Sequence, residues 1–251
     1  MHQYKYKTEL HCHTATVSGC ATEDPAVLLE KYIRAGYSSI VVTDHFEELN
    51  TNTLSKTLRE KDRIRFLPTG FDMNILDRCD KDEMSWDDKI DFQMAGYRYL
   101  KELAGDRINI LLGAELRLPF AQNHYLLYGL TEEFLRREVD LTKKFIFDAS
   151  DIIRQNDILF IQAHPFRNWD SVTRPDVIDG IEVYNGAKRQ DYRNDLAEIW
   201  AERYHLIPTA GTDFHRIEDL PDAGILTEKP IETTQELVEI LRSGHYELIK
   251  E

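Results

Sequence analysis

Histidine and carboxylate side chains at short, regular spacing are the part of this sequence that can do chemistry. His11 and His13 are separated by one residue, and so are Asp213 and His215. On an extended chain, residues two apart project to the same side, so each pair would present both polar groups to one place while Cys12 points away. A neutral imidazole is the commonest metal-binding side chain, and a carboxylate adds negative charge and can bridge two cations. The combination favours a site for zinc, iron or manganese.

Polar residues of the same types follow other apolar runs of the chain. They are His45, with Asp44 before it, Glu115 and His164. Gathering so many unpaired polar groups in one cavity without a cation would cost several kcal/mol, so bound metal ions are expected to supply the compensating charge. Asp44 is expected to hold a ligand histidine in place rather than to bind a metal itself.

The elements that must position these residues alternate along the chain. Seven short runs rich in apolar and β-branched residues are predicted strands, at residues 6–11, 39–43, 108–112, 125–128, 158–162, 180–184 and 206–209. The predicted helices are one that begins at Pro25 after an Asp24 cap, and residues 86–103, 144–155, 189–203 and 234–243, whereas residues 48–85 are expected to form loop and broken helix.

This alternation predicts a parallel sheet, because parallel neighbours need crossover connections. Periodicity alone does not distinguish a closed barrel from an open sheet. The placement of polar residues after five of the strands favours a barrel, since the loops at the carboxyl ends of barrel strands converge on one mouth.

Five motifs in chain order make the sequence resemble the PHP (polymerase and histidinol phosphatase) superfamily. They are His11-Cys12-His13-Thr14, Thr43-Asp44-His45, Gly113-Ala114-Glu115, Ala163-His164-Pro165 and Gly211-Thr212-Asp213-Phe214-His215, within residues 6 to about 215. The resemblance implies a single α/β domain over residues 1–251, folded as a distorted seven-stranded (β/α)7 barrel similar to a TIM barrel. It also implies a site at the carboxyl ends of the strands that holds two or three divalent metal ions (Zn, Mn or Fe).

The same resemblance implies three metal positions. The first would be held by His11, His13, Glu115 and Asp213, the second by Glu115, His164 and His124, and the third by His45, His215 and Cys20. Cys20 lies seven residues after His13, where several family members have histidine or aspartate, and a thiolate binds zinc well and manganese poorly. His124 precedes the predicted strand at residues 125–128 instead of following a strand, so a simple barrel would place it at the wrong end. The branch of the family associated with bacterial replicative polymerases has a metal-binding histidine at a comparable place.

The implied activity is that of a metal-dependent phosphoric ester hydrolase. A hydroxide bridging two metals would attack a small phosphomonoester, with histidinol phosphate or a similar metabolite as the candidate substrate. The catalytic residues would be Glu115, Asp213 and His215, and the residues that bind the substrate phosphate would be Arg167, Lys188 and Arg189. Arginine suits this role because its planar fork matches two phosphate oxygens.

Three other functions remain open on the sequence. A nuclease or nucleotide phosphodiesterase would use the same superfamily ligands. An amidohydrolase would also use HxH, later histidines and an aspartate, but such enzymes usually bridge their metals with a carboxylated lysine, and here Glu115 takes the comparable place. A non-catalytic domain stabilised by metals is the third alternative.

Composition limits the partners and the compartment. The chain has 251 residues with 31 basic and 45 acidic side chains, a formal net charge of −14, which argues against long nucleic acids as partners. Because no apolar run approaches the length of a membrane span and no secretory signal opens the sequence, we expect a cytoplasmic protein without a membrane partner. Its three cysteines are expected to be reduced thiols. The oligomeric state is left open.

Overall fold

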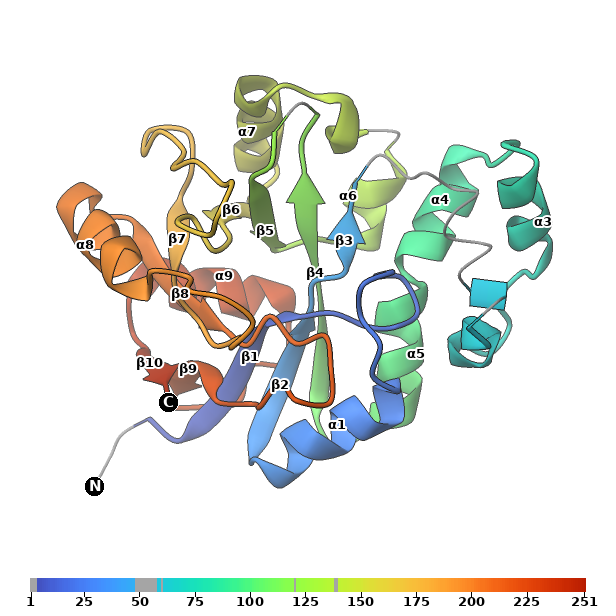
Figure 1. Cartoon of the computed structure of the whole chain (residues 1–251), viewed down its shortest axis with the longest axis horizontal. Coiled ribbons are helices and arrows are strands. Elements are labelled where there is room, and N and C mark those ends of the chain that lie inside the picture. The colour runs from blue at the N-terminus through green and yellow to red at the C-terminus, as the bar shows by residue number, and fades with distance from the viewer. Residues whose placement is uncertain (1–3, 48–57, 60, 120, 138–139) are drawn as a thin grey trace.

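Ten strands of the computed structural model form one mixed sheet that curves into a nearly closed barrel (Figure 1). The structure describes residues 4–47, 58–59, 61–119, 121–137 and 140–251. The strands are β1 (Tyr6–Cys12), β2 (Tyr37–Val42), β3 (His45–Phe46), β4 (Asn109–Arg117), β5 (His124–Tyr128), β6 (Leu159–Gln162), β7 (Gly180–Asn185), β8 (Ile207–Gly211), β9 (Ala223–Thr227) and β10 (Glu247–Lys250). Their order in the sheet is β10-β9-β1-β2-β4-β5-β6-β7-β8, and β3 pairs with β4 beside this path.

The two ends of the barrel path meet just beyond β1 and β8. Cys12 and Phe214 form an isolated parallel bridge. The His13 amide donates to the Phe214 carbonyl at 3.1 Å, and the Phe214 amide donates to the His11 carbonyl at 3.3 Å. This seam brings the motif around His11 against the motif around Asp213, although 200 residues separate them in the chain.

The seven-stranded (β/α)7 detail is not confirmed. Each of the seven predicted strands is present, but the described part of the chain adds β3, β9 and β10. The strands are also not all parallel, because β5 is antiparallel to both β4 and β6, and β9 is antiparallel to β1 and β10. The general prediction of a barrel-like α/β fold holds, whereas the prediction of a uniformly parallel sheet is wrong.

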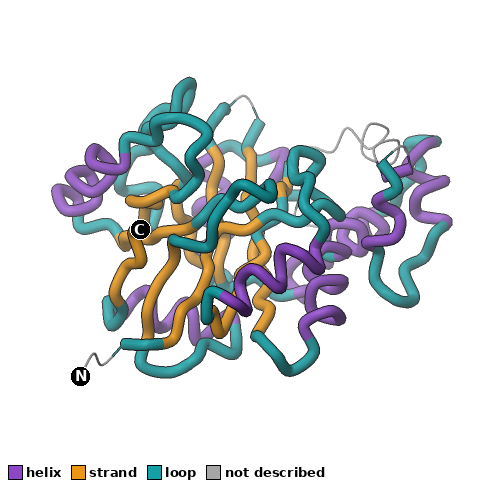
Figure 2. The backbone as a smooth tube through the Cα atoms, turned by 60° about the horizontal axis from the view of Figure 1, so that its bottom comes forward, coloured by secondary structure: helices purple, strands orange, loops and turns teal. Residues whose placement is uncertain are grey.

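The helices flank the strands on both sides (Figure 2). They are α1 (Pro25–Arg34), α3 (Asn74–Asp80), α4 (Trp86–Gln93), α5 (Ala95–Ala104), α6 (Glu132–Arg136), α7 (Ile146–Gln155), α8 (Asn194–Tyr204) and α9 (Thr234–Ser243), with short 3-10 turns at Arg63–Phe66 and Leu141–Lys143. Among the described residues, no helix has the length and apolar character needed to cross a bilayer.

The starts of the helices follow the local sequence. Asp24 caps α1 by accepting a hydrogen bond from the Ala26 amide, and Pro25 occupies the first turn, as predicted. The predicted helix at residues 86–103 is two helices, α4 and α5, which break at Met94. In the region 48–85 the described residues contain one 3-10 turn and α3, consistent with the predicted loop and broken helix, whereas 48–57 and 60 lie outside the described residues.

A buried apolar cluster lies within the sheet and holds the strands together. Leu10, Val41 and Ile161, from three different strands, belong to a cluster that also contains Leu237 and Leu241 of α9. Burying a side chain of this size contributes about 1.5–3 kcal/mol, so the strands form a rigid frame for the polar residues at their ends.

Candidate metal centre

The predicted ligands of the first metal position converge in the structure. His11 is the penultimate residue of β1 and His13 follows that strand, Glu115 lies on β4, and Asp213 follows β8. The His11 and His13 Nε2 atoms are 3.1 Å apart, and each lies 3.4 Å from Asp213 Oδ1. Glu115 approaches both rings, with Oε1 at 3.4 Å from His11 Nε2 and Oε2 at 3.5 Å from His13 Nε2. All four side chains are buried.

The outer nitrogen of each of these two imidazoles has its own partner. His11 Nδ1 lies 2.8 Å from Glu182 Oε1, and His13 Nδ1 lies 3.1 Å from the Ser18 hydroxyl, which itself donates to Asp44 at 2.6 Å. These partners favour the proton on Nδ1 of both rings, which leaves two Nε2 lone pairs facing each other. Lone pairs at that distance repel unless a cation or a proton lies between them, so the arrangement fits a metal.

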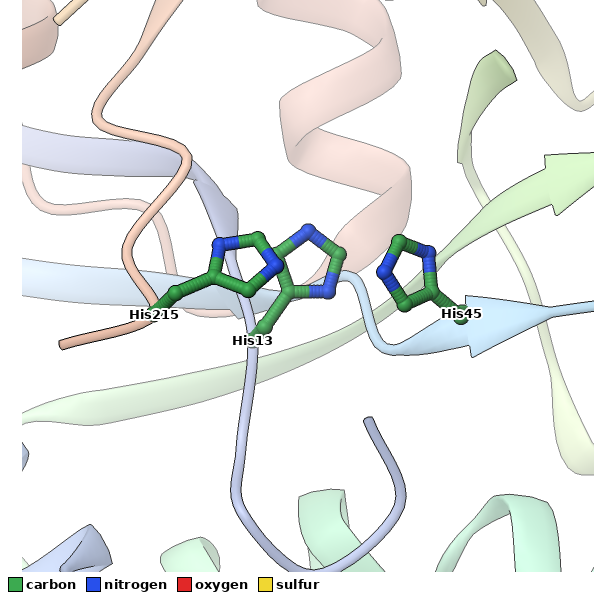
Figure 3. A group of neighbouring side chains, drawn as sticks. All are labelled: His13, His45 and His215. Carbon is green, nitrogen blue, oxygen red and sulfur yellow. The ribbon is translucent and has the colours of Figure 1, made fainter. Parts of the chain in front are cut away.

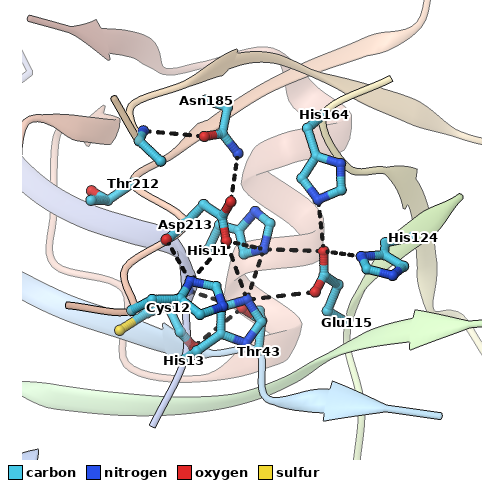
Figure 4. Close-up of polar contacts among 12 residues, drawn as sticks. His11, Cys12, His13, Thr43, Glu115, His124, His164, Asn185, Thr212 and Asp213 are labelled. Atoms are coloured by element: carbon cyan, nitrogen blue, oxygen red, sulfur yellow. Dashed lines mark hydrogen bonds and ion pairs between the residues drawn. The ribbon is translucent and has the colours of Figure 1, made fainter. Parts of the chain in front are cut away.

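The predicted ligands of the second position also meet, on one oxygen of the same Glu115 carboxylate. Glu115 Oε1 lies 3.0 Å from His164 Nε2 and 3.1 Å from His124 Nδ1, and Figure 4 shows both rings directed at that oxygen. His164 Nδ1 lies 3.1 Å from Asp170 Oδ2, which fixes the ring with Nε2 facing inward.

His124 reaches this mouth because β5 is reversed. An antiparallel strand presents its first residue at the edge where its neighbours end, and His124 pairs in register with Arg117 at the end of β4. The direction of β5 therefore explains how His124, which was expected at the wrong end of the barrel, reaches the other predicted ligands.

The third group combines two imidazoles and a thiol. Cys20 Sγ lies 3.1 Å from His45 Nε2 and 3.1 Å from His215 Nε2. The His13 ring lies between these histidines, with ring centroids 4.4 Å and 4.2 Å away, and Figure 3 shows the three rings side by side. Burial raises the pKa of Cys20, but its contacts with His215 and His45 outweigh burial and lower the pKa to about 6. This lowered pKa favours the thiolate, the form of cysteine that binds metals.

The electrostatics of the cluster are those of a site that lacks positive charge. Burial lowers the pKa of His11, yet the carboxylates of Glu182, Asp213 and Glu115 overcome burial and raise it well above its ordinary value. Conversely, the surrounding imidazoles hold the pKa of Glu115 and that of Asp213 well below their usual ranges against the opposing effect of burial. Burial and the neighbouring His215 and His45 lower the pKa of His13.

The donor set fits divalent cations. Within the described part of the chain, Glu115 Oε2 is buried and accepts no hydrogen bond of good geometry, although His45 Nδ1 lies 2.7 Å away. Groups of three neighbouring side chains that could hold a metal recur across the cluster: His13, His45 and His215; His11, His13 and Glu115; His11, His164 and Asp213; His45, Glu115 and His124. Histidine with carboxylate suits zinc, iron or manganese, and the thiol of the third group favours zinc.

Two of the predicted ligands have strained backbones. His164 has φ +26° and Asp213 has φ +54°, which are uncommon for residues other than glycine. Such conformations cost about 1–3 kcal/mol each and concentrate at functional sites. Gly211, two residues before Asp213, lets β8 approach β1 closely, because a Cβ there would collide with His11.

The three predicted phosphate-binding residues lie at different distances from the cluster. Arg189 is closest, with Nη2 2.9 Å from Asp213 Oδ2 and Nη1 2.8 Å from Asp219. Arg167 Nε lies 3.0 Å from Asp170, the carboxylate that holds His164. Lys188 is 69% exposed and its Nζ pairs with Asp222 at 3.1 Å, so the structure does not bring it to the ligands.

Asp44 was expected to hold a ligand histidine, and it accepts a hydrogen bond from the Ser18 hydroxyl that contacts His13. Sequence reasoning missed Ser18 and two other carboxylates that orient the ligands. Glu182 touches His11 Nδ1, accepts a hydrogen bond from the His164 amide at 2.9 Å, and accepts another from Asn185 at 3.0 Å. Glu9 accepts hydrogen bonds from the His11 and Thr212 amides, and so joins β1 to the end of β8. For Glu182 the available signal was a glutamate inside an otherwise apolar predicted strand, residues 180–184, whereas Glu9 lies in a run with other polar residues and gave no such signal.

Comparisons with known proteins found one family match and several structures with a similar fold. A family described as PHP-associated matches residues 191–246. The structure of PsfC from Pseudomonas syringae PB-5123 aligns at 15% identity with a TM-score of 0.56, covering 96% of this chain and 97% of that one. The lesion-specific endonuclease PfuEndoQ from Pyrococcus furiosus aligns at 15% identity with a TM-score of 0.57 over 97% of this chain, which spans 57% of the endonuclease.

These structural likenesses show a shared fold, and no curated protein matches the chain in sequence. The PHP-associated match covers residues that include the predicted ligands Asp213 and His215. It agrees with the resemblance of the five ordered motifs to the PHP (polymerase and histidinol phosphatase) superfamily, and the fold brings predicted ligands from all five motifs to one cluster.

Proposed function

We propose that this protein is a metal-dependent phosphoesterase that hydrolyses a small phosphomonoester with two or three bound divalent ions (Zn, Mn or Fe). The observation that carries the proposal is the position of Glu115. Its Oε1 faces His124 and His164 while its Oε2 faces His45 and His13, so one buried carboxylate serves several metal positions. A structural zinc site needs only four closed ligands, whereas this cluster gathers nine predicted ones.

Each group of the cluster has a role in this proposal. When bound, the cations would lower the pKa of a water at the site and neutralise charge on the phosphate oxygens. Glu115 holds the ligands of two positions together, and Asp213, fixed by Arg189, is placed to orient the attacking water. His215 and Asp213 share a contact through His215 Nδ1, so His215 couples the third position to the first.

Arg189 is the best-placed candidate for binding the substrate phosphate, because it contacts Asp213 itself and its side chain is 27% exposed. Arg167, 23% exposed, is a second candidate that is paired with Asp170 beside His164. Lys188 remains a more distant candidate for this role. Arginine binds phosphate oxygens in pairs, which adds direction to the attraction.

A nuclease or nucleotide phosphodiesterase is the second candidate. It is favoured by the fold shared with the lesion-specific endonuclease over 97% of this chain. The net charge of −14 weakens it for long nucleic acids, because phosphate binding there depends on releasing counterions to cationic surfaces. Short oligonucleotides and mononucleotides are compatible with an acidic surface.

The test is a metal analysis followed by two matched chromogenic esters. Protein loaded with Zn, Mn or Fe should hydrolyse p-nitrophenyl phosphate, and Glu115→Gln should lose both bound metal and activity. Glu239→Gln on the exposed face of α9 is the control and should behave as wild type. A higher rate on bis-p-nitrophenyl phosphate would favour the diesterase. A fully metallated protein that hydrolyses no monoester and no diester would refute both candidates.

A further inference from the structure

A solvent-exposed tryptophan stands beside the metal cluster in a strained loop. Trp169 follows β6 and is 91% exposed, with a left-handed φ of +77°. A large apolar ring that is left in water contributes no burial free energy to folding. A positive φ is an outlier for a bulky residue. Neither feature helps the fold, so both point to a role in binding.

Trp169 borders a cavity of about 520 Å³. The cavity is lined by Gln122, Arg167, Asn168, Trp169, Asp170 and Gln190. Its volume lies within the range of small-molecule sites, roughly 300–1,000 Å³. The lining offers one aromatic face, three carboxamides, and a guanidinium that is already paired with a carboxylate.

The cavity adjoins the second metal position. Asp170, in its wall, lies 3.1 Å from His164 Nδ1, and Gln122 lies two residues before His124. The loop that carries Trp169 is fixed on both sides, since Arg167 Nε pairs with Asp170 at 3.0 Å and Arg193 donates to Asn168 at 3.2 Å. A phosphoester bound at the cluster would therefore extend its organic part into this cavity.

The chemistry of the lining selects among organic groups. A carboxamide both donates and accepts hydrogen bonds, which matches the ring nitrogens and exocyclic groups of a heteroaromatic ring. The exposed indole offers a stacking face, and base–aromatic stacking tolerates any planar ring. Asp170 neutralises Arg167, so the cavity does not carry the free positive charge that a second phosphate would need.

We infer that this cavity binds the organic part of the substrate, and that this part is a planar heteroaromatic ring of the nucleobase kind, stacked on Trp169. The inference rests on the proposed function, which it deepens by naming the substrate class as mononucleotides. Gln122 and Gln190 are then the residues that contact the edge of the ring.

Binding can be tested without chemistry. Adenosine, which carries no phosphate, should quench the tryptophan fluorescence of the metal-free protein. Trp169→Leu should abolish the quenching, whereas Trp200→Phe, on the partly buried tryptophan of α8, should preserve it. Equal quenching in wild type and Trp169→Leu would overturn the inference.

Activity provides an independent readout on the metal-loaded protein. Trp169→Leu should raise KM for adenosine monophosphate roughly tenfold more than KM for glycerol 2-phosphate, and Trp169→Phe should restore most of the difference. Equal changes for the two esters would overturn the inference while leaving the phosphoesterase intact. Quenching by adenosine with no hydrolysis of any ester would support the cavity and refute the proposed function.

Discussion

Replacing Glu182 with glutamine should weaken metal binding without removing any ligand. The Glu182 carboxylate accepts hydrogen bonds from His11 Nδ1 at 2.8 Å, from the His164 amide at 2.9 Å and from Asn185 Nδ2 at 3.0 Å. A glutamine keeps only one of the two oxygens. If its oxygen serves the His164 amide and Asn185, its NH2 group meets His11 and moves the proton of that ring to Nε2, the atom that should bind metal.

The opposite orientation of the glutamine is also unfavourable. Its oxygen would then serve His11, and its NH2 group would face two buried donors, at a cost of about 1–3 kcal/mol for each one left unpaired. Partners that orient a ligand histidine are typically worth 10–100-fold in metal affinity, or about 1.4–2.7 kcal/mol. We therefore expect Glu182→Gln to bind zinc 10–100-fold more weakly.

The assay is zinc competition against a chelator, with the thermal midpoint of the metal-free protein measured in parallel. Asp179→Asn is the matched control, because Asp179 is a carboxylate three residues before Glu182. It accepts a hydrogen bond from the Phe160 amide, and no contact with an imidazole is described for it. Wild-type zinc affinity in a folded Glu182→Gln variant would refute the reasoning. An equal loss in Asp179→Asn would show that the effect is general to carboxylates near β7.

Four further predictions follow from the same geometry. The Cys20 pKa of about 6 predicts that the rate of its alkylation by iodoacetamide in the metal-free protein rises through pH 6 and levels off at higher pH. Bound zinc should suppress the alkylation. A midpoint near 8.5, the ordinary pKa of cysteine, would contradict an effect of the two histidine contacts on the thiol. The neighbouring carboxylates favour the protonated form of His11, so zinc must displace a proton in order to bind there. Zinc binding should therefore acidify a weakly buffered solution, and zinc affinity should rise with pH. A pH-indicator dye that records no proton release would contradict this prediction. His124→Ala should lose metal from the second position with little change in stability, whereas the exposed His245→Ala should retain all metal, both counted by elemental analysis. Gly96→Ala should destabilise the fold by about 1–3 kcal/mol in urea, because its Cβ would collide with the Asp44 carboxylate and the Thr14 hydroxyl; an unchanged midpoint would show that this contact can relax.

The sequence predicted which residues gather, because strand ends of a barrel-like sheet must share a mouth. It did not predict strand direction, and the reason lies in one boundary. The strand predicted at residues 108–112 continues to Arg117, so only residues 118–123 connect it to His124. A connection that short joins antiparallel strands, whereas the longer connection that the prediction implied was compatible with a parallel crossover.

The residues that orient the ligand histidines could not be predicted from the sequence, for a different reason. Glu182 and Ser18 act through hydrogen bonds to ring nitrogens across long stretches of chain, and nothing in their local spacing indicates those partners. The two short strands β9 and β10 were missed because each is only four or five residues long, and β9 contains Gly224, which weakens strand propensity.

The reversal of β5 has a consequence for how this site can diversify. Glu115 and His124 sit on the two arms of one hairpin, locked by the register that pairs Arg117 with His124 and Glu115 with Leu126. Residues inserted or deleted at the tip of that hairpin would leave both arms where they are, since register is set by the paired arms and their buried faces. Evolution can therefore reshape the tip, which also supplies Gln122 to the neighbouring cavity, and alter ligand preference while the shared carboxylate and its imidazole keep their relative positions.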